Sequence, residues 1–222
     1  MVTRSSRKKS GKKLGFFVLV LILFPLLGAA AFFYNLIKDL PSPERITERV
    51  VAESTKIFDR TGKVILYEIH GEEKRTVIPF EEIPEIVKQA TVAAEDINFY
   101  KHSGIDWRGI VRAALKNLAR GNIAQGGSTI TQQLVKNSLL GPERTFRRKI
   151  REQILAIILE RKYSKDEILE FYLNQIPYGS NAYGIYAAAQ TYFAKEVKEL
   201  TSAEAAMLAA LPKAPTYYSP YG

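Results

Sequence analysis

The sequence predicts a mainly α domain with a small β-hairpin element, preceded by one transmembrane helix. Three observations lead to this prediction. Residues 15–37 carry no charge and are dominated by apolar side chains. Residues 55–69 place two apolar runs on either side of a polar turn, and from residue 82 onward apolar residues recur mainly at helical spacing. At 222 residues the chain is long enough to bury one substantial core behind these N-terminal elements.

Residues 1–14 form a basic tail that holds most of the formal net charge of +9. A charge concentrated in this way favours attraction to anionic lipid head groups, so membrane lipids are expected partners and nucleic acid is not. The chain contains no cysteine, which excludes disulfides and thiolate metal sites.

The apolar run at 15–37 is long enough to cross a membrane, since a helix rises about 1.5 Å per residue and the hydrocarbon core is roughly 30 Å thick. The basic tail predicts that the N-terminus is cytoplasmic and that the rest of the chain is outside. A cleavable signal peptide is the alternative, because Ala29 to Ala31 offer small residues at a cleavage point. The apolar run continues past them to Ile37, which favours an uncleaved anchor.

Residues 38–53, with Pro41 and Pro43, are predicted to be a juxtamembrane linker, and residues 54–222 the globular domain. Its first element is a hairpin over 55–69 with a turn at Asp59 to Gly62. A helix is expected over 82–96, and another after Asp106, amphipathic and ending at Gly121. Further helices are predicted to begin at Ser128, near Thr145, at Ser164 and at Thr201, the last two with capping boxes.

Glu95 opens the first of two polar clusters, EDINFYKHSG over 95–104. It follows an apolar helical pattern, so burial is expected to raise the pKa of its carboxyl, which suits a general base. The alternative is a carboxylate in solvent at a helix end. His102, taken alone, is predicted to be a structural hydrogen-bonding residue.

The second cluster is GGSTITQQLVKN over 126–137. We expect Ser128 to cap a helix whose exposed N–H groups can bind phosphate oxygens. Thr129, Gln133, Lys136 and Asn137 are predicted to share one polar face, and Ile130 and Leu134 to face the core. Hydrogen-bonding groups with a single lysine suit a sugar diphosphate, although such a face is often merely solvated.

In a third segment, Arg148 and Glu152 are i, i+4 neighbours on a helix. They lie opposite an apolar line formed by Phe146, Ile150, Ile154 and Ile157. An exposed ion pair of little energetic value is the ordinary interpretation of such a pair.

Taken together, these segments resemble the peptidoglycan glycosyltransferases (glycosyltransferase family 51), the transglycosylase domains of class A penicillin-binding proteins and of monofunctional transglycosylases. Five motifs match in order. They are ED-x-x-F-x-x-H-x-G from Glu95, G-x-S-T-I-T-Q-Q from Gly126, Arg148-Lys149-x-x-Glu152, K-x-x-I-L-E-x-Y-L-N from Lys165, and Ala209 to Pro215. Within the fourth motif, Glu170 and Asn174 are expected to tie helices together.

The resemblance implies a lysozyme-like helical fold and a set of site residues. Glu95 and Glu152 would be the catalytic carboxylates. Substrate-binding positions would be Asp96, Phe99, His102, Gly127, Ser128, Thr129, Gln132, Gln133, Lys136, Asn137, Arg148 and Lys149.

The implied reaction joins a lipid-linked glycan to lipid II in β-1,4 linkage, with inversion and release of undecaprenyl diphosphate. Lys136 and Arg148 would neutralise the pyrophosphate, alone or with a divalent cation (Mg or Mn) near Glu152. Lipid II, the lipid-linked glycan and other cell-wall synthesis proteins are the implied partners. The implied location is the bacterial inner membrane, and moenomycin, a phosphoglycolipid that inhibits the family, is an expected ligand.

Family members normally continue with a further helix, and many carry a C-terminal transpeptidase domain. We therefore expect the glycosyltransferase domain to be cut short after Gly222, and predict no transpeptidation from these residues. Two other functions stay open: a membrane-anchored lysozyme-like lytic enzyme, and a catalytically silent cell-wall scaffold.

Overall fold

The computed structural model describes residues 7–49, 55–61, 65–69, 74–120 and 127–218, and it confirms the mainly α fold with a small β element. It divides into two compact units, residues 1–40 and 41–222. The expected turn residue Gly62, the helix end at Gly121, and Gly126 lie outside the described residues. The first unit contains one long helix, α1 (Arg7–Ile37). Within it, Leu19–Ile37 is long and apolar enough to cross a membrane, by length and composition.

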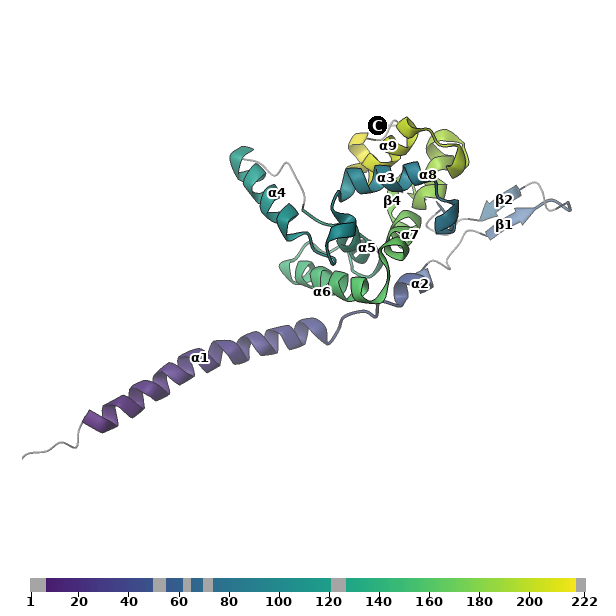
Figure 1. The fold of residues 1–222 in the computed structure, drawn as a ribbon. Helices are drawn as coiled ribbons and strands as arrows, with labels where there is room; N and C mark the ends of the chain where they lie inside the picture. Colours follow the sequence, from purple (N-terminus) through teal and green to yellow (C-terminus); the bar gives the residue numbers. More distant parts are fainter. Residues whose placement is uncertain (1–6, 50–54, 62–64, 70–73, 121–126, 219–222) are drawn as a thin grey trace, which may run out of the picture. The chain divides into compact units, whose positions relative to one another are not determined.

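The second unit carries the remaining elements (Figure 1). Its helices are α2 (Arg45–Arg49), α3 (Glu85–Glu95), α4 (Trp107–Arg120), α5 (Ile130–Ser138), α6 (Phe146–Lys162), α7 (Lys165–Gln175), α8 (Gly184–Phe193), α9 (Ser202–Ala210) and α10 (Pro215–Tyr218). The short 3-10 turns are η1 (Phe80–Glu82), η2 (Phe99–Lys101), η3 (Val197–Glu199) and η4 (Leu211–Lys213). The strands are β1 (Thr55–Phe58), β2 (Ile65–Ile69), β3 (Lys74–Arg75), β4 (Pro177–Gly179) and β5 (Ala182–Tyr183).

The strands form two small sheets. The predicted hairpin is present, because β1 and β2 pair antiparallel with Thr55 opposite Ile69. A three-stranded sheet, in the order β3-β5-β4, has β3 parallel and β4 antiparallel to β5. The segment expected to be a linker contains α2, whose Ile46 is buried and accepts a hydrogen bond at its carbonyl from Gln175.

Helix starts largely follow the predicted caps. Asp106 caps α4, since its Oδ1 accepts from the Gly109 N–H at 2.9 Å. Thr145 caps α6, and Ser164 and Thr201 form the expected capping boxes of α7 and α9. Two starts differ: α3 begins at Glu85 with Pro84 as its N-cap, and Thr129 rather than Ser128 caps α5.

Helix α5 lies at the centre of the packing that positions the site, since it contacts both α6 and α7, while α3 packs on α9 (Figure 1). Ile130 and Leu134 of α5 are buried, as predicted. Asn174 of α7 bonds both the N–H and the C=O of Ile78, at 3.0 and 2.9 Å. Its role is structural, but it ties α7 to the segment before η1 and not to another helix.

The buried face of α6 is not the one expected. Its core side carries Glu152, Leu155, Ala156 and Leu159, whereas Phe146 on the predicted apolar line is 91% exposed. Burying a carboxylate in preference to a phenyl ring requires compensating partners, and Glu152 has two cations beside it.

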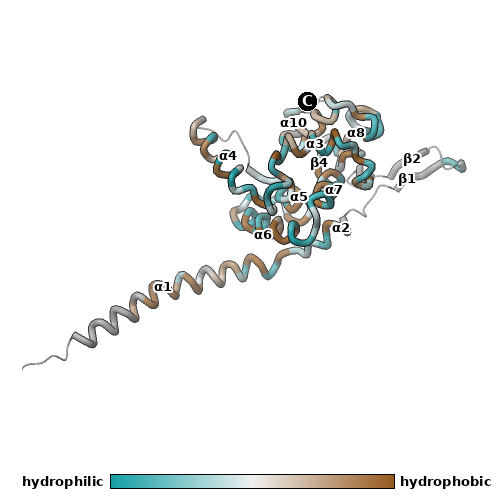
Figure 2. Tube along the Cα trace, viewed as in Figure 1, coloured by the Kyte–Doolittle hydropathy of each residue, from teal (hydrophilic) through white to brown (hydrophobic). Residues whose placement is uncertain are grey.

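Helix α4 also departs from a simple core-facing helix. Hydrophobic residues run along it (Figure 2), and four of them are exposed: Trp107, Val111, Leu115 and Leu118. They follow one another at spacings of four, four and three residues and therefore share one face.

Candidate functional site

Glu95 is the last residue of α3, and its carboxyl is partly buried between helices. Oε2 accepts a hydrogen bond of 2.6 Å from Nε2 of Gln133. Burial raises the pKa of the carboxyl, as the sequence predicted; Gln133 and Lys213 oppose the rise, and Asp96 adds to it. Oε1 is buried and has no hydrogen-bond partner among the described residues. One carboxylate oxygen is therefore held by Gln133, and the other has no partner that would compete for a proton.

A cavity of about 290 Å³ opens beside this carboxyl, and we call it the Glu95 cavity. The end of α3, one side of α4 and the segment before α5 form its walls. Its lining residues are Ala93, Ala94, Glu95, Asp96, Ile97, Asp106, Gly109, Arg112, Lys116, Gly127, Ser128 and Thr129.

A closed circuit of hydrogen bonds joins the first and second polar clusters. Oδ2 of Asp96 accepts from the Ile130 N–H at 3.1 Å and lies 2.9 Å from Nε2 of His102. Nδ1 of His102 accepts from the Gly104 N–H at 3.2 Å, which leaves Nε2 to donate to Asp96. The Gly104 carbonyl accepts from Thr129 at 2.7 Å, next to Ile130. His102 thus makes the structural hydrogen bonds expected of it taken alone, and its substrate-binding role stays a prediction.

Several residues predicted to bind substrate make their contacts inside the fold. Phe99 is fully buried, with its ring edge-to-face against that of His102. Thr129 and Gln132 are also buried, and they bond each other in the capping box of α5. Ser128, which does not cap the helix, accepts a hydrogen bond from Lys149 at 2.8 Å.

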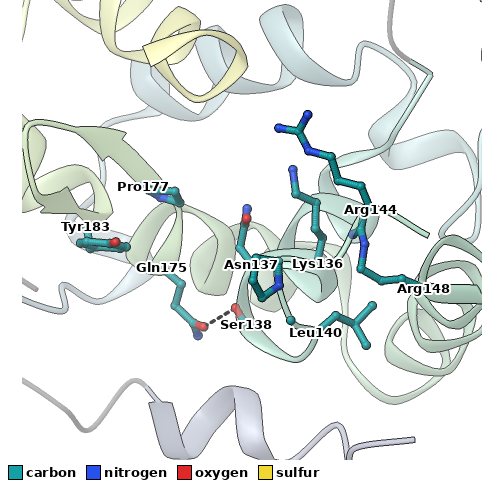
Figure 3. A pocket seen from close by; sticks show the side chains of 11 residues that line it. Lys136, Asn137, Ser138, Leu140, Arg144, Arg148, Gln175, Pro177 and Tyr183 are labelled. Carbon is teal, nitrogen blue, oxygen red and sulfur yellow. Dashed lines mark hydrogen bonds between the residues drawn. The ribbon is translucent and has the colours of Figure 1, made fainter. Parts of the chain in front are cut away.

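A second cavity, of about 650 Å³, lies at the C-terminal end of α5. Three cationic side chains, Lys136, Arg144 and Arg148, are grouped on one side of it, with Pro177 and Tyr183 on the other (Figure 3). We call it the cationic cavity. Asn137 lines it too, so the structure brings together Lys136, Asn137 and Arg148 as expected. Nε of Arg148 is buried without a hydrogen-bond partner among the described residues.

Glu152 connects the two cavities although it lines neither of them. It is 1% exposed and is paired with Arg148, whose Nη1 lies 3.3 Å from Oε2, and with Lys149. Arg148 lines the cationic cavity, while Lys149 reaches Ser128 at the Glu95 cavity. The buried anion therefore positions one cation toward each cavity.

The surroundings of Glu152 do not fit a divalent cation. Both carboxylate oxygens accept from positively charged groups, which would repel a metal ion. Across the described part of the chain, no group of three or more His, Cys, Asp or Glu is placed to hold one. A need for Mg or Mn stays a prediction, and no chemical step is assigned to it below.

Sequence reasoning missed two residues of the site. Arg144 lines the cationic cavity from just before the cap of α6, and only the run of basic residues from 144 to 151 could have pointed to it. Lys213 lowers the pKa of Glu95 from η4, more than a hundred residues away in the chain, where a closing motif was noted without a role.

Comparison with known proteins relates the chain to one family. A family model described as Transglycosylase matches residues 62–222. Penicillin-binding protein 1A of Aquifex aeolicus (strain VF5) is 48% identical over 210 residues, which cover 95% of this chain and 29% of that protein. Penicillin-binding protein 1A/1B of Bacillus subtilis (strain 168) is 46% identical over 217 residues, covering 96% and 23%. Penicillin-binding protein 1F of the same organism is 49% identical over 173 residues, covering 77% and 24%.

The chain thus spans less than a third of the length of these relatives, and the matched region includes both cavities. Because the family model covers well over half of the chain, the protein belongs to the transglycosylase family.

Proposed function

We propose that this domain is a peptidoglycan glycosyltransferase that polymerises lipid II into β-1,4-linked glycan strands. One arrangement carries the proposal: a partly buried carboxyl with a raised pKa lies at one cavity, and three cations line a second cavity at the C-terminal end of α5. The first arrangement suits proton abstraction from a hydroxyl, and the second suits a diphosphate leaving group.

In this proposal the acceptor, lipid II, binds in the Glu95 cavity. The Glu95 carboxylate takes the proton from the GlcNAc 4-hydroxyl of lipid II, and the hydroxyl oxygen attacks C1 of the MurNAc at the end of the donor. Because the base must be ionised, the rate increases as the pH rises through the pKa of Glu95, and burial moves this increase to higher pH than for an exposed carboxyl.

The pyrophosphate of the donor, the lipid-linked glycan, binds in the cationic cavity in this proposal. The bond from C1 to the pyrophosphate oxygen breaks, the electron pair leaves with undecaprenyl diphosphate, and an α-linked donor gives a β-linked product. Lys136, Arg144 and Arg148 offset the negative charge of the leaving group. Arg148 is fixed by Glu152, so we assign Glu152 as a positioning residue.

The proposed function and its two rivals predict different outcomes with the same substrate. A lytic enzyme would protonate a sugar oxygen and would have no use for the three cations of the cationic cavity. A silent scaffold would need neither the free oxygen of Glu95 nor the paired Glu152. Incubation of the purified chain with lipid II therefore decides among polymer, glycan fragments and no reaction.

Two isosteric variants test the roles of the carboxylates. Glu95→Gln removes the base, so turnover should fall by about 10² or more, while affinity for a donor analogue such as moenomycin is kept. Glu152→Gln should lower both turnover and analogue affinity, because Arg148 loses its charged partner. Polymerisation at the parental rate by Glu95→Gln would refute the assigned base.

We further propose that the protein is held at the bacterial cell membrane with the domain outside. The apolar helix Leu19–Ile37 and the basic residues before it support this arrangement. Helix α4 supports a second contact with anionic lipid. Its exposed apolar residues, Trp107 among them, accompany four basic residues and no acidic one between 107 and 120.

A further inference from the structure

A chain of two hydrogen bonds leads from the core of the domain to the carboxyl of Glu95. It begins at Tyr172 of α7, whose side chain is fully buried. The hydroxyl of Tyr172 lies 3.2 Å from Oε1 of Gln133 on α5, and Nε2 of Gln133 lies 2.6 Å from Oε2 of Glu95 on α3. Three helices distant in the sequence thus meet in one line of contacts.

The polarity of this chain is determined at both ends. An ionised carboxylate can only accept, so the amide of Gln133 must present its NH2 group to Glu95 and its oxygen to Tyr172. Burial keeps the pKa of Tyr172 well above its usual value, so its hydroxyl keeps its proton and donates it to that oxygen. A flipped amide would place two acceptors against each other at Glu95.

We propose that Tyr172 is a positioning residue for the catalytic base: it holds the Gln133 amide in the orientation that donates to Oε2 of Glu95 and leaves Oε1 without a partner. The inference rests on the proposed function, in which Glu95 is that base. Tyr172 touches neither substrate nor the reacting atoms in this scheme, and it acts only through Gln133.

Through Gln133, the Tyr172 hydroxyl would influence the pKa of Glu95. The bond from Gln133 favours the carboxylate against the cost of burial. Without the Tyr172 hydroxyl the amide is free to turn and to accept a hydrogen bond from the protonated carboxyl, which favours the neutral acid. Loss of the hydroxyl should therefore raise the pKa of Glu95 and reduce the active fraction on the acid side of the pH profile.

Other charged and titratable groups near Glu95 do not supply this orientation. Asp96 raises and Lys213 lowers its pKa through space, and Tyr178, buried nearby, stays neutral because burial raises its own pKa. The lining of the Glu95 cavity adds the charged side chains Asp106, Arg112 and Lys116. Among the described residues, only Gln133 donates a hydrogen bond to the carboxylate.

The test is the pH dependence of lipid II polymerisation by Tyr172→Phe, which keeps the buried ring. We expect the acid limb of kcat to move up by about 0.7 pH unit, the equivalent of one net hydrogen bond. At high pH the rate of Tyr172→Phe should return toward the parental plateau, and its KM should equal that of the parent. Tyr192→Phe is the matched control, since it removes another buried tyrosine hydroxyl, one that donates to the Tyr178 carbonyl at 2.9 Å. An equal shift in the control would overturn the inference.

A second variant approaches the same contact from the other side. Gln133→Met removes the amide and should move the acid limb in the same direction. Adding Tyr172→Phe to it should shift the profile no further, because both changes act through one bond. Additive shifts would show that Tyr172 acts elsewhere.

Titration of the Glu95 carboxyl by carbon-13 NMR, assigned by its loss in Glu95→Gln, reads the pKa without turnover. It distinguishes a failure of the proposed base, Glu95, from a failure of the proposed role of Tyr172. If Glu95→Gln polymerises at the parental rate, the proposed base is wrong whatever Tyr172 does. If Glu95→Gln is inactive while Tyr172→Phe keeps the parental titration and pH profile, the base stands and the role of Tyr172 is wrong.

Discussion

Gly104 shows how closely the two polar clusters are tied to α6. Its φ is +89°, and a Cβ on this residue would lie 2.9 Å from the Ala156 carbonyl oxygen. Gly104→Ala should therefore lower the free energy of unfolding by about 2 kcal/mol or more, through backbone strain and this contact. Gly141→Ala is the control, since a Cβ there meets nothing within 4 Å. Thermal or denaturant unfolding in detergent measures both, and equal losses would contradict the explanation.

Lys136 tests the cationic cavity at the level of one charge. It is exposed on α5 and lines the cavity with Arg144 and Arg148. Lys136→Ala should weaken moenomycin binding by roughly 1.5–3 kcal/mol, the value of a charge-assisted hydrogen bond. Lys198→Ala, an exposed lysine on η3, should leave the affinity unchanged. Unchanged affinity in a folded Lys136→Ala protein would remove this residue from the site.

At the scale of elements, the start of α9 links stability to pH. Oε2 of Glu204 accepts from the N–H and hydroxyl of Thr201, and Oε1 accepts from Lys195 at 2.6 Å. The Lys195 hydrogen bond, followed by those from Thr201, lowers the pKa of Glu204 from 4.5 to about 2. Since the folded protein holds the ionised form more tightly than the unfolded chain, this stabilisation is complete above 4.5 and is lost as the pH falls toward 2.

Glu204→Gln keeps an acceptor for the capping box but cannot ionise. We expect the parent to unfold at a higher temperature than this variant near neutral pH, and the difference to shrink as the pH falls from 4.5 to about 2. A difference that stays constant through that range would show that the charge of Glu204 is not its source. Helix α9 packs on α3, so the same loosening would reach the element that carries Glu95.

Helix α4 offers a direct test of membrane contact, because Trp107 is the only tryptophan in the chain and is 66% exposed. In the full chain reconstituted into vesicles containing anionic lipid, we expect lipids brominated on their acyl chains to quench its fluorescence. Aqueous acrylamide should quench it less than in the unfolded protein. Leu115→Glu together with Leu118→Glu should reverse both effects, since it charges the exposed apolar face. Unhindered acrylamide quenching in the parent would contradict lipid contact.

At the scale of the whole domain, α5 holds the two cavities in one frame. The segment before it lines the Glu95 cavity, its C-terminal end lines the cationic cavity, and Glu152 on α6 steadies a cation for each. An acceptor hydroxyl and a donor pyrophosphate bound there would be set by one helix rather than by separate loops. This arrangement suits a reaction whose rate depends on bringing two large substrates into line.

Local features of this protein were readable from the sequence. The caps Asp106, Thr145, Ser164 and Thr201 were predicted where the structure has them, and so was the hairpin at 55–69. Such signals depend on residues only a few positions apart, so spacing and residue type determine them. The family resemblance named Glu95, Lys136 and Arg148 as site residues, and the structure places Glu95 at one cavity and the two cations at the other.

Tertiary structure decided which side of each helix is buried and what each site residue touches. Glu152 and the Phe146 line could each have faced the core, and the cations of Arg148 and Lys149 made burial of the carboxylate possible. The contacts of Gln133 with Glu95 and Tyr172 span 38 and 39 residues. No local pattern specifies contacts of that span, because they form only when three separately folded helices pack together. The sequence by itself therefore determined most of the longer helices and the residue types of the site, and packing determined which of those residues face a ligand and which hold the others in place.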